Sequence, residues 1–279
     1  MKSKKVSIVI PTKNSAEFLE KTLQTIKSQS YPDIETIIVD GNSTDKTLAI
    51  AKKYKTQIIK FIPKVSTGLF DAPYKRNLGM KMAAGEYVYW LDADMELPNN
   101  LIKEAVELCE KGFDAVVLPE DSFGTGRWSK AKQLERRCYF GDSTVESPRF
   151  FKKKVWDDIG GFDESLGAGG DDVDLTQKLL EKDYKIGRTK SIVLNNEGHL
   201  TIKKLYRKKF MYGREMKNYI VKRPKSSFQS YFPIRPAYVR HWKMLLSHPV
   251  DTCLLVYMRT VENTAGFAGL VYSFFEKQK

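Results

Sequence analysis

Two aspartates, Asp92 and Asp94, stand one residue apart at the end of an apolar stretch, 87–91. An ionised carboxylate is costly to bury alone, so two of them beside an apolar strand need a cation, a proton or a backbone partner. Their hard oxygen atoms suit Mg²⁺ or Mn²⁺, ions that one or two carboxylates commonly hold together with substrate phosphates. The pair therefore predicts a divalent cation and a ligand that carries phosphate.

A second acidic group, Asp171-Asp172-Val173-Asp174, follows the glycine-rich stretch 167–170 and opens a segment with helical spacing that continues to about Asp183. Carboxylates in the first turn of a helix often cap its backbone, and capping is the interpretation we favour for Asp174 and for Asp45. For the other acids of this group, capping and acid–base chemistry both stay open.

The first sixty residues alternate between strand and helix patterns. Short apolar runs at 6–10, 34–39 and 57–62 are typical of strands, and the stretches 15–29 and 46–54 carry apolar residues at helical spacing. This βαβαβ order predicts an α/β fold with a mostly parallel, Rossmann-like sheet flanked by helices. A helix at 101–111 and a strand at 115–119 extend the pattern, whereas 121–148 gives no clear signal.

Ligands of parallel sheets bind beyond the carboxyl ends of the strands. Thr12, Asp40 and the Asp92/Asp94 pair each follow a predicted strand. We therefore expect three separate segments to meet at one edge of the sheet.

The length of 279 residues suits one α/β domain with an appendage, and we divide the chain into residues 1–200 and 201–279. The three cysteines are widely spaced and lack CxxC spacing, which argues against a disulfide framework and a zinc site and favours a reducing compartment. The apolar run after the basic N-terminus is too short for a secretion signal. We expect a cytoplasmic protein.

The net charge of +13 is concentrated in one segment. Residues 203–225 contain ten lysines and arginines and one glutamate, so this segment accounts for +9. It also carries apolar residues at helical spacing, and a basic amphipathic helix is typical of membrane-surface binding. No apolar run reaches the ~20 residues of a membrane span. We expect 201–279 to lie on a membrane surface, with ordinary helices packed on the domain as the alternative.

Two other functions fit parts of the pattern. A nucleic-acid-binding protein would use the basic block, but the aromatic residues there mostly share the apolar stripe, so we expect no nucleic acid as partner. A nucleotidyltransferase shares metal carboxylates and a parallel sheet, yet the segment 11–14 lacks the glycine of a phosphate-binding loop.

Several ordered motifs together resemble the family 2 glycosyltransferases, which have a GT-A-type fold. The resemblance covers residues ~5 to 200 and rests on these motifs: 6–14, Val39-Asp40-Gly41-Asn42-Ser43-Thr44-Asp45, Arg76-Asn77, Ala84-Gly85-Glu86-Tyr87, Leu91-Asp92-Ala93-Asp94, Gly160-Gly161-Phe162-Asp163-Glu164 and Gly170-Asp171-Asp172-Val173-Asp174-Leu175. Their order and spacing together are far more specific than an isolated Asp-x-Asp.

The resemblance implies a role for each matching residue. Pro11, Thr12 and Asn14 would shape the nucleotide pocket, and Asp40 would recognise the base. Arg76 would reach the donor, while Asp94, helped by Asp92, would hold Mg²⁺ or Mn²⁺ on its diphosphate. The implied catalytic base is Asp172, although the family's usual Glu-Asp is Asp171-Asp172 here. His199 matches a histidine that touches metal or diphosphate in related enzymes; a plain surface histidine is the alternative.

The implied activity is inverting, metal-dependent transfer of a sugar from a nucleotide-diphosphate donor to an acceptor hydroxyl or phosphate. A divalent cation would stabilise the departing diphosphate, and a carboxylate would accept the proton of the acceptor. The acceptor would be a glycan or a lipid-linked molecule at the cytoplasmic membrane face. We interpret Gly160-Gly161-Phe162 as a structural turn, and Trp128 as either a core residue or a sugar-stacking residue.

Overall fold

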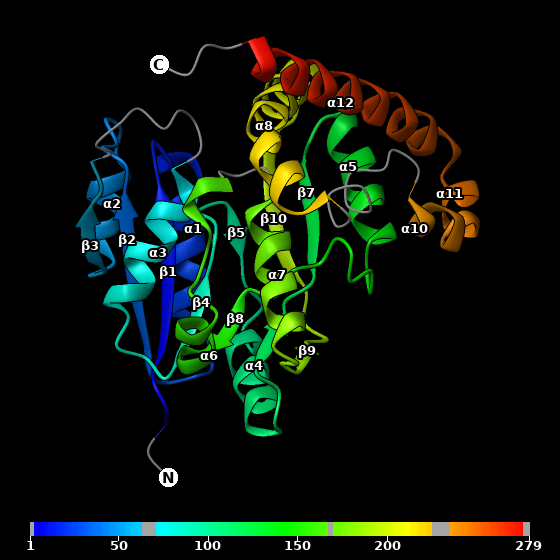
Figure 1. Cartoon of the computed structure of the whole chain (residues 1–279). Helices are drawn as coiled ribbons and strands as arrows, with labels where there is room; N and C mark the ends of the chain where they lie inside the picture. The colour runs from blue at the N-terminus through cyan, green and yellow to red at the C-terminus, as the bar shows by residue number, and fades with distance from the viewer. Residues whose placement is uncertain (1–2, 63–70, 167–169, 225–234, 276–279) are drawn as a thin grey trace. The chain divides into compact units, whose positions relative to one another are not determined.

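The structure is a computed structural model that describes residues 3–62, 71–166, 170–224 and 235–275. Most of the predicted glycine-rich stretch at 167–170, the last basic residue at 225 and the final four residues lie outside this range. The chain forms two compact units (Figure 1). The sheet unit comprises 1–120, 147–164 and 174–195, and the helical unit comprises 121–146, 165–173 and 196–279. The helical unit thus contains three segments that a division at residue 200 leaves in the first domain: 121–146, 165–173 and 196–200.

A seven-stranded sheet, in the order β3-β2-β1-β4-β8-β6-β9, forms the centre of the sheet unit. Neighbours β1 and β2, β2 and β3, β1 and β4, and β6 and β9 run parallel, whereas β8 is antiparallel to both β4 and β6. The predicted α/β class with a mostly parallel sheet is confirmed. The strands are β1 (Val6–Thr12), β2 (Ile34–Asp40), β3 (Gln57–Lys60), β4 (Tyr87–Trp90), β6 (Ala115–Val117), β8 (Phe150–Lys152) and β9 (Ile186–Arg188).

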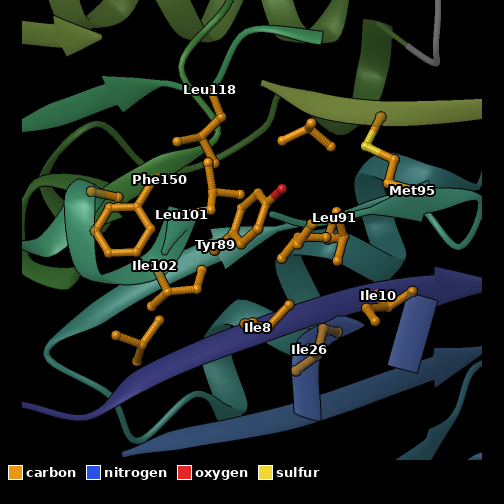
Figure 2. Packing of buried hydrophobic residues seen from close by; sticks show 14 of the residues in the cluster. Ile8, Ile10, Ile26, Tyr89, Leu91, Met95, Leu101, Ile102, Leu118 and Phe150 are labelled. Atoms are coloured by element: carbon orange, nitrogen blue, oxygen red, sulfur yellow. The ribbon is translucent and has the colours of Figure 1, made fainter. Parts of the chain in front are cut away.

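Side chains of a strand point alternately to opposite faces of a sheet, so both faces of this sheet carry apolar side chains. Each face is covered by an apolar cluster with helices. Ile8 and Tyr89 face one apolar cluster and Val9 and Trp90 face another (Figure 2 shows the first). Helices α1 (Ala16–Lys27), α2 (Thr47–Lys53) and α4 (Leu101–Glu110) contribute to the first cluster; α3 (Ala72–Met82), α6 (Lys153–Asp158) and α7 (Asp171–Glu181) contribute to the second. Each predicted helix and strand in the first 118 residues is present within two residues of its expected ends.

A smaller three-stranded sheet has the order β5-β10-β7, formed by β5 (Met95–Glu96), β10 (Val193–His199) and β7 (Glu120–Thr125). β10 begins in the sheet unit, where Leu194 and Asn195 pair with β5, and its last residues belong to the helical unit. The stretch 121–148, which gives no clear sequence signal, forms most of β7 and the helix α5 (Arg127–Cys138).

The helical unit is built mainly from α5, α8 (Ile202–Lys222), α10 (Pro236–Arg240), α11 (Trp242–Ser247) and α12 (Pro249–Phe275). The 3-10 turn Glu164–Leu166 begins at the last residue of a sheet-unit segment, and its other two residues belong to the helical unit. Thr201 caps α8 by accepting a hydrogen bond of 3.2 Å from the backbone N–H of Lys204. The core of the unit is an apolar cluster to which α5, α8 and α12 each contribute: Ala131, Leu134, Leu200, Leu205, Leu255 and Met258.

Glycines allow α8 and α12 to approach each other closely. A Cβ on Gly213 would lie 2.0 Å from the carbonyl oxygen of Gly266, and one on Gly269 would lie 1.9 Å from that of Phe210. These distances are far below a van der Waals contact, so the helix backbones touch where the glycines stand. Of the apolar stripe of α8, Leu205 and Tyr219 are buried inside the unit, whereas Tyr206 is exposed.

A buried charge cluster joins α5 to α12. Lys132 lies 2.6 Å from Glu135 and 3.4 Å from Glu262, and Arg259 lies 3.2 Å from Glu135 and 2.8 Å from Glu262. Both glutamates are at most 2% exposed. Lys209 of α8 adds a further positive charge nearby, and burial lowers its pKa to about 8 despite the attraction of Glu262. Two cations and two anions thus neutralise each other where the helices meet.

Replacing Gly213 by alanine should destabilise the protein, because the new methyl group overlaps the backbone of α12. We expect a loss of about 1–3 kcal/mol in the free energy of unfolding, measured by denaturant titration. Gly266→Ala is the matched control, since its Cβ would meet nothing closer than the Lys209 carbonyl oxygen at 3.9 Å. That variant should be neutral or slightly stabilising. Equal losses in the two variants would contradict the close helix contact.

Candidate active site

The carboxyl ends of β1 and β2 are tied together by Asp40. Parallel pairing places Thr12 beside Asp40, and the Thr12 hydroxyl donates a 2.9 Å hydrogen bond to Oδ1 of this aspartate. Ser43 donates its backbone N–H to Oδ2 at 2.9 Å and its hydroxyl to Oδ1 at 2.5 Å. Asp40 is buried. Recognition of the base by Asp40 stays a prediction. In this structure the carboxylate joins two strand ends and the loop between β2 and α2.

Asn14 shapes the neighbouring loop. It has a φ of 52°, in the left-handed region that asparagine tolerates better than most residues. Its side-chain carbonyl accepts a hydrogen bond of 2.8 Å from the N–H of Thr44, and its own N–H donates to the Ser43 hydroxyl at 2.8 Å. Pro11 has no N–H to donate. β1 pairs with β4 only as far as Val9, so the proline costs no hydrogen bond to β4. Two of the predicted pocket residues, Thr12 and Asn14, therefore contact Asp40 and the loop that follows it.

Asp92 lies between two arginines at the end of β4. Arg76 Nη2 is 2.7 Å from Oδ1 of Asp92, and Arg149 Nη1 is 3.0 Å from Oδ2. Arg149 also bonds Glu120 at 2.5 Å. Both arginine side chains are at least 88% buried, whereas that of Asp92 is 32% exposed. Asp92 is thus held at both oxygens by α3 and by the residue before β8.

The ring of Trp90 contacts both arginines of this network. The guanidinium carbons of Arg76 and Arg149 lie 4.2 Å and 3.9 Å from the Trp90 ring, so cation–π attraction adds to the ion pairs. Burial by itself raises the pKa of Asp92, but the two arginines outweigh it and hold the pKa well below its usual range. Asp92 is therefore a carboxylate at every physiological pH.

Asp94 follows two residues later, in the turn between β4 and β5. Its side chain is half-buried, and the turn is fixed by the Thr22 hydroxyl, which donates a 2.8 Å hydrogen bond to the carbonyl of Ala93. The turn leaves the sheet beside β1, since the N–H of Leu91 still bonds the carbonyl of Val9 at 2.9 Å. Asp94 thus stands at the strand edge that carries Thr12 and Asp92.

The contacts of Asp92 and Asp94 bear on the predicted metal site. Within the residues that the structure describes, no three His, Cys, Asp or Glu side chains gather as a ready-made metal site. Both oxygens of Asp92 already accept hydrogen bonds from arginine, so a cation there would compete with two positive charges. Asp94 offers the hard carboxylate oxygens that suit Mg²⁺ or Mn²⁺ with phosphates as further ligands. The chemistry of the two carboxylates is compatible with such a cation, and both Asp94 and Asp92 as its ligands stay predictions.

Asp172 belongs to the helical unit, in the first turn of α7. Gly170, two residues before it, has a φ of 140°, and a Cβ there would lie 2.5 Å from the ring of Tyr219. Asn218, the neighbour of Tyr219 on α8, donates a 2.9 Å hydrogen bond to the Ser165 carbonyl. The C-terminal half of α8 therefore braces the segment that carries the predicted base.

His199 ends β10, also in the helical unit. Its Nδ1 lies 3.1 Å from the Thr125 hydroxyl, and its carbonyl accepts a hydrogen bond from the Lys204 side chain at 3.1 Å. The imidazole is exposed. Its contact with a metal stays a prediction.

Two other residues have structural roles. Phe162 is 3% exposed and packs edge-on against Trp90 and Trp156, so the structural interpretation of the Gly160-Gly161-Phe162 turn is confirmed. Asn77 holds this turn by bonding both the N–H and the carbonyl of Phe162. Trp128 is half-buried, packs against the apolar cluster of the helical unit and stacks on the exposed Tyr257 of α12 with ring centroids 5.7 Å apart; sugar stacking by Trp128 stays a prediction.

Sequence reasoning did not single out Arg149, Ser43 or Lys75. Lys75 is buried, pairs with Asp71 at 2.8 Å and donates a 3.2 Å hydrogen bond to the carbonyl of Thr12. An arginine before a short strand gives no signal in the sequence, because only the antiparallel pairing of β8 with β4 brings Arg149 to Asp92. The adjacency of Lys75 to Arg76 could have indicated a second cation at this edge.

Comparison with known proteins places these observations in a family. A family model described as Glycosyl transferase family 2 matches residues 7–170. TarP of Staphylococcus aureus, a poly(ribitol-phosphate) β-N-acetylglucosaminyltransferase, is 31% identical over 170 residues, which cover 55% of this chain and 50% of TarP. The GalNAc(5)-diNAcBac-PP-undecaprenol β-1,3-glucosyltransferase of Campylobacter jejuni is 28% identical over 154 residues, covering 54% and 48%. The chain spans about half the length of these relatives.

Solved structures share the fold. The mannosyltransferase PcManGT of Pyrobaculum calidifontis, in complex with GDP-Man and Mn²⁺, aligns with a TM-score of 0.67 at 18% identity, over 99% of this chain and 88% of that one. S. aureus TarS 1–349 in complex with UDP-GlcNAc aligns with a TM-score of 0.51 at 17% identity, over 97% and 91%. The expected GT-A-type fold is confirmed. With its family model matching more than half of its length, the chain belongs to glycosyltransferase family 2.

Proposed function

We propose that this protein is an inverting glycosyltransferase that moves a sugar from a nucleotide-diphosphate donor to an acceptor hydroxyl or phosphate. The observation that carries the proposal is the meeting of Thr12, Asp40, Asp92 and Asp94 at the carboxyl ends of β1, β2 and β4. Nucleotides bind at this edge in parallel α/β sheets. The glycosyltransferases related to the chain support the choice of reaction.

The sheet unit would bind the donor. Pro11, Thr12 and Asn14 would line the nucleotide pocket with Asp40, whose bonds to Ser43 keep the pocket loop in place. Arg76 would contribute positive charge beside the diphosphate while it stays paired with Asp92. Mg²⁺ or Mn²⁺, held by Asp94 with Asp92 and His199 as candidate ligands, would stabilise the negative charge of the departing diphosphate.

The helical unit would supply the base. Asp172 would accept the proton of the acceptor hydroxyl as the new C–O bond forms and the bond to the diphosphate breaks on the opposite side of the sugar. The anomeric configuration would thereby invert. Bracing of Gly170 by Tyr219 would keep Asp172 in place, because a group that transfers a proton must be held within hydrogen-bond reach.

The acceptor would be a glycan or a lipid-linked molecule at the cytoplasmic face of a membrane, with 201–279 on the membrane surface. The C. jejuni relative, whose name specifies an undecaprenol-linked acceptor, supports a lipid-linked one. Among the helices in the described ranges, none is both long and apolar enough to span a bilayer. The match to family 2 favours sugar transfer over the nucleotidyltransferase alternative and over nucleic-acid binding through the basic block.

The two aspartates of the pair should fail in different ways. Asp94→Asn should lower metal-dependent turnover of UDP-GlcNAc or GDP-Man at least about a hundredfold, since the metal contributes several kcal/mol to the transition state. Its thermal unfolding should stay close to that of the wild type. Asp92→Asn should instead cost about 1–3 kcal/mol of stability, because Arg76 and Arg149 lose their shared anion.

Donor release assays with Mn²⁺ and denaturant titrations of the same two variants would separate these effects. The double variant Asp92→Asn with Arg76→Met serves as the control, since it removes one charge of each sign and leaves the Arg149–Glu120 pair intact, and it should recover part of the lost stability. An Asp94→Asn enzyme that turns over donor at the wild-type rate would refute the metal role.

Asp172→Asn should lower kcat by about a hundredfold to ten-thousandfold with little change in donor affinity, because only proton acceptance is removed. The matched variant is Asp171→Asn, one residue away in the same helix turn, which should keep most of the activity. Isothermal titration with the nucleotide sugar and initial-rate measurements give the two quantities. If Asp171→Asn lost more activity than Asp172→Asn, the base would have to be reassigned.

A further inference from the structure

The outward face of α12 carries no charge. Twelve residues of this helix are exposed. Pro249 and Val250 lie in its first turn, and the other ten lie mostly on one side of the helix: Cys253, Val256, Tyr257, Thr260, Thr264, Phe267, Val271, Tyr272, Phe274 and Phe275. Phe267 is 69% exposed and Phe275 80%. An aromatic stripe of this length on a soluble surface marks a site of interaction. We call these ten residues the α12 stripe.

The charged residues of α12 are used elsewhere. Only Asp251, Arg259 and Glu262 are charged in the helix, and the last two point into the cluster with Lys132 and Glu135 of α5. The opposite side of α12 packs on α8 through Gly213 and Gly269. The buried charges and glycines therefore fix which side of the helix faces outward, and that side is the uncharged one.

Cations border the stripe at its C-terminal end. The guanidinium carbon of Arg214 lies 5.3 Å from the Tyr272 ring, and Nζ of Lys217 lies 4.8 Å from the ring of Phe274. Before α12, Trp242 and Lys243 of α11 are exposed with Leu246 one turn later. Aromatic rings with neighbouring lysine or arginine at both ends of an apolar stripe are the pattern of helices that lie in the headgroup region.

Further positive charge comes from α8. Lys203, Lys204, Arg207 and Lys208 are exposed on its first turns. The segment 203–225 holds +9 of the net charge of +13. Such a block attracts a surface of anionic headgroups, to which each nearby lysine or arginine adds affinity.

We propose that the α12 stripe inserts into the interfacial layer of a bilayer that contains anionic lipids, with α12 lying parallel to the membrane surface. A helix of 27 residues is about 40 Å long, so parallel to the surface it buries the whole stripe. Arg214 and Lys217 beside the stripe complement lipid phosphates, whereas the net charge of +13 would make two copies of this chain repel each other. The inference deepens the proposed membrane location and does not depend on the transfer chemistry.

This assignment narrows the sequence-based expectation, which places the whole of 201–279 on the membrane surface. The clearest membrane signal in the sequence is the segment 203–225, whose apolar residues share a helical stripe with basic neighbours. In the structure Leu205 and Tyr219 of that stripe are buried, and α8 instead supplies cations. The membrane-facing apolar side chains come from α12.

Vesicle flotation of the full chain tests the proposal. Wild-type protein should float with phosphatidylcholine vesicles that contain about one quarter phosphatidylglycerol, and should bind pure phosphatidylcholine more weakly. Raising NaCl from about 0.05 to about 0.5 M should weaken binding to the anionic vesicles. The double variant Phe267→Asp with Phe275→Asp should lose at least about tenfold in apparent affinity, since two charges enter the apolar face.

The matched control is Met82→Asp with Leu180→Asp, which places the same two charges at half-exposed apolar positions of the sheet unit. It should float like the wild type. Failure of the wild type to bind anionic vesicles, or equal binding by the two double variants, would overturn the proposal. Light scattering that showed a dimer lost in Phe267→Asp with Phe275→Asp would assign the stripe to a second copy instead. Nucleotide-sugar binding in solution, measured on the same samples, tests the proposed function separately.

Discussion

The candidate site depends on the neutralisation of Asp92. A carboxylate at the end of a buried strand is costly unless opposite charges surround it, and here Arg76 and Arg149 contact both oxygens while stacking on Trp90. The network joins α3 and β4, which are neighbours in the sequence, to Arg149 before β8, 57 residues beyond Asp92. It fixes the strand end from which the turn with Asp94 departs. The geometry of any cation bound there rests on this arrangement of charges.

The predicted site residues are divided between two units. Thr12, Asp40 and Asp94 belong to the sheet unit, and Asp172 and His199 belong to the helical unit. Within the helical unit, Tyr219 of α8 packs against Gly170, and α12 packs on α8 through glycines. The same packing that braces the predicted base also directs the uncharged side of α12 outward. The contact between α8 and α12 thus affects both the position of the predicted base and the side of α12 that is exposed.

Much of the sheet unit could be predicted, because its signals are local. Strands at 6–10 and 34–39 are mostly apolar, as strands buried on both faces tend to be, and Pro11 and Gly41 lie near their ends. The stretch 121–148 could not be interpreted in this way. Most of α5 is polar or charged, and Glu135 is buried only because Lys132 and Arg259 neutralise it. Its burial depends on a partner more than a hundred residues away.

The sequence by itself determined the α/β class, the strand ends that carry Thr12, Asp40, Asp92 and Asp94, and the position of the charge. Those properties follow from hydrophobic periodicity, turn residues and composition, which act over a few residues. Only the tertiary structure decided that Arg149 holds Asp92, that part of the apolar stripe of α8 is buried inside its unit and that α12 carries the exposed apolar face. These outcomes depend on strand pairing and helix contacts between distant segments, and no local pattern encodes which segments will meet.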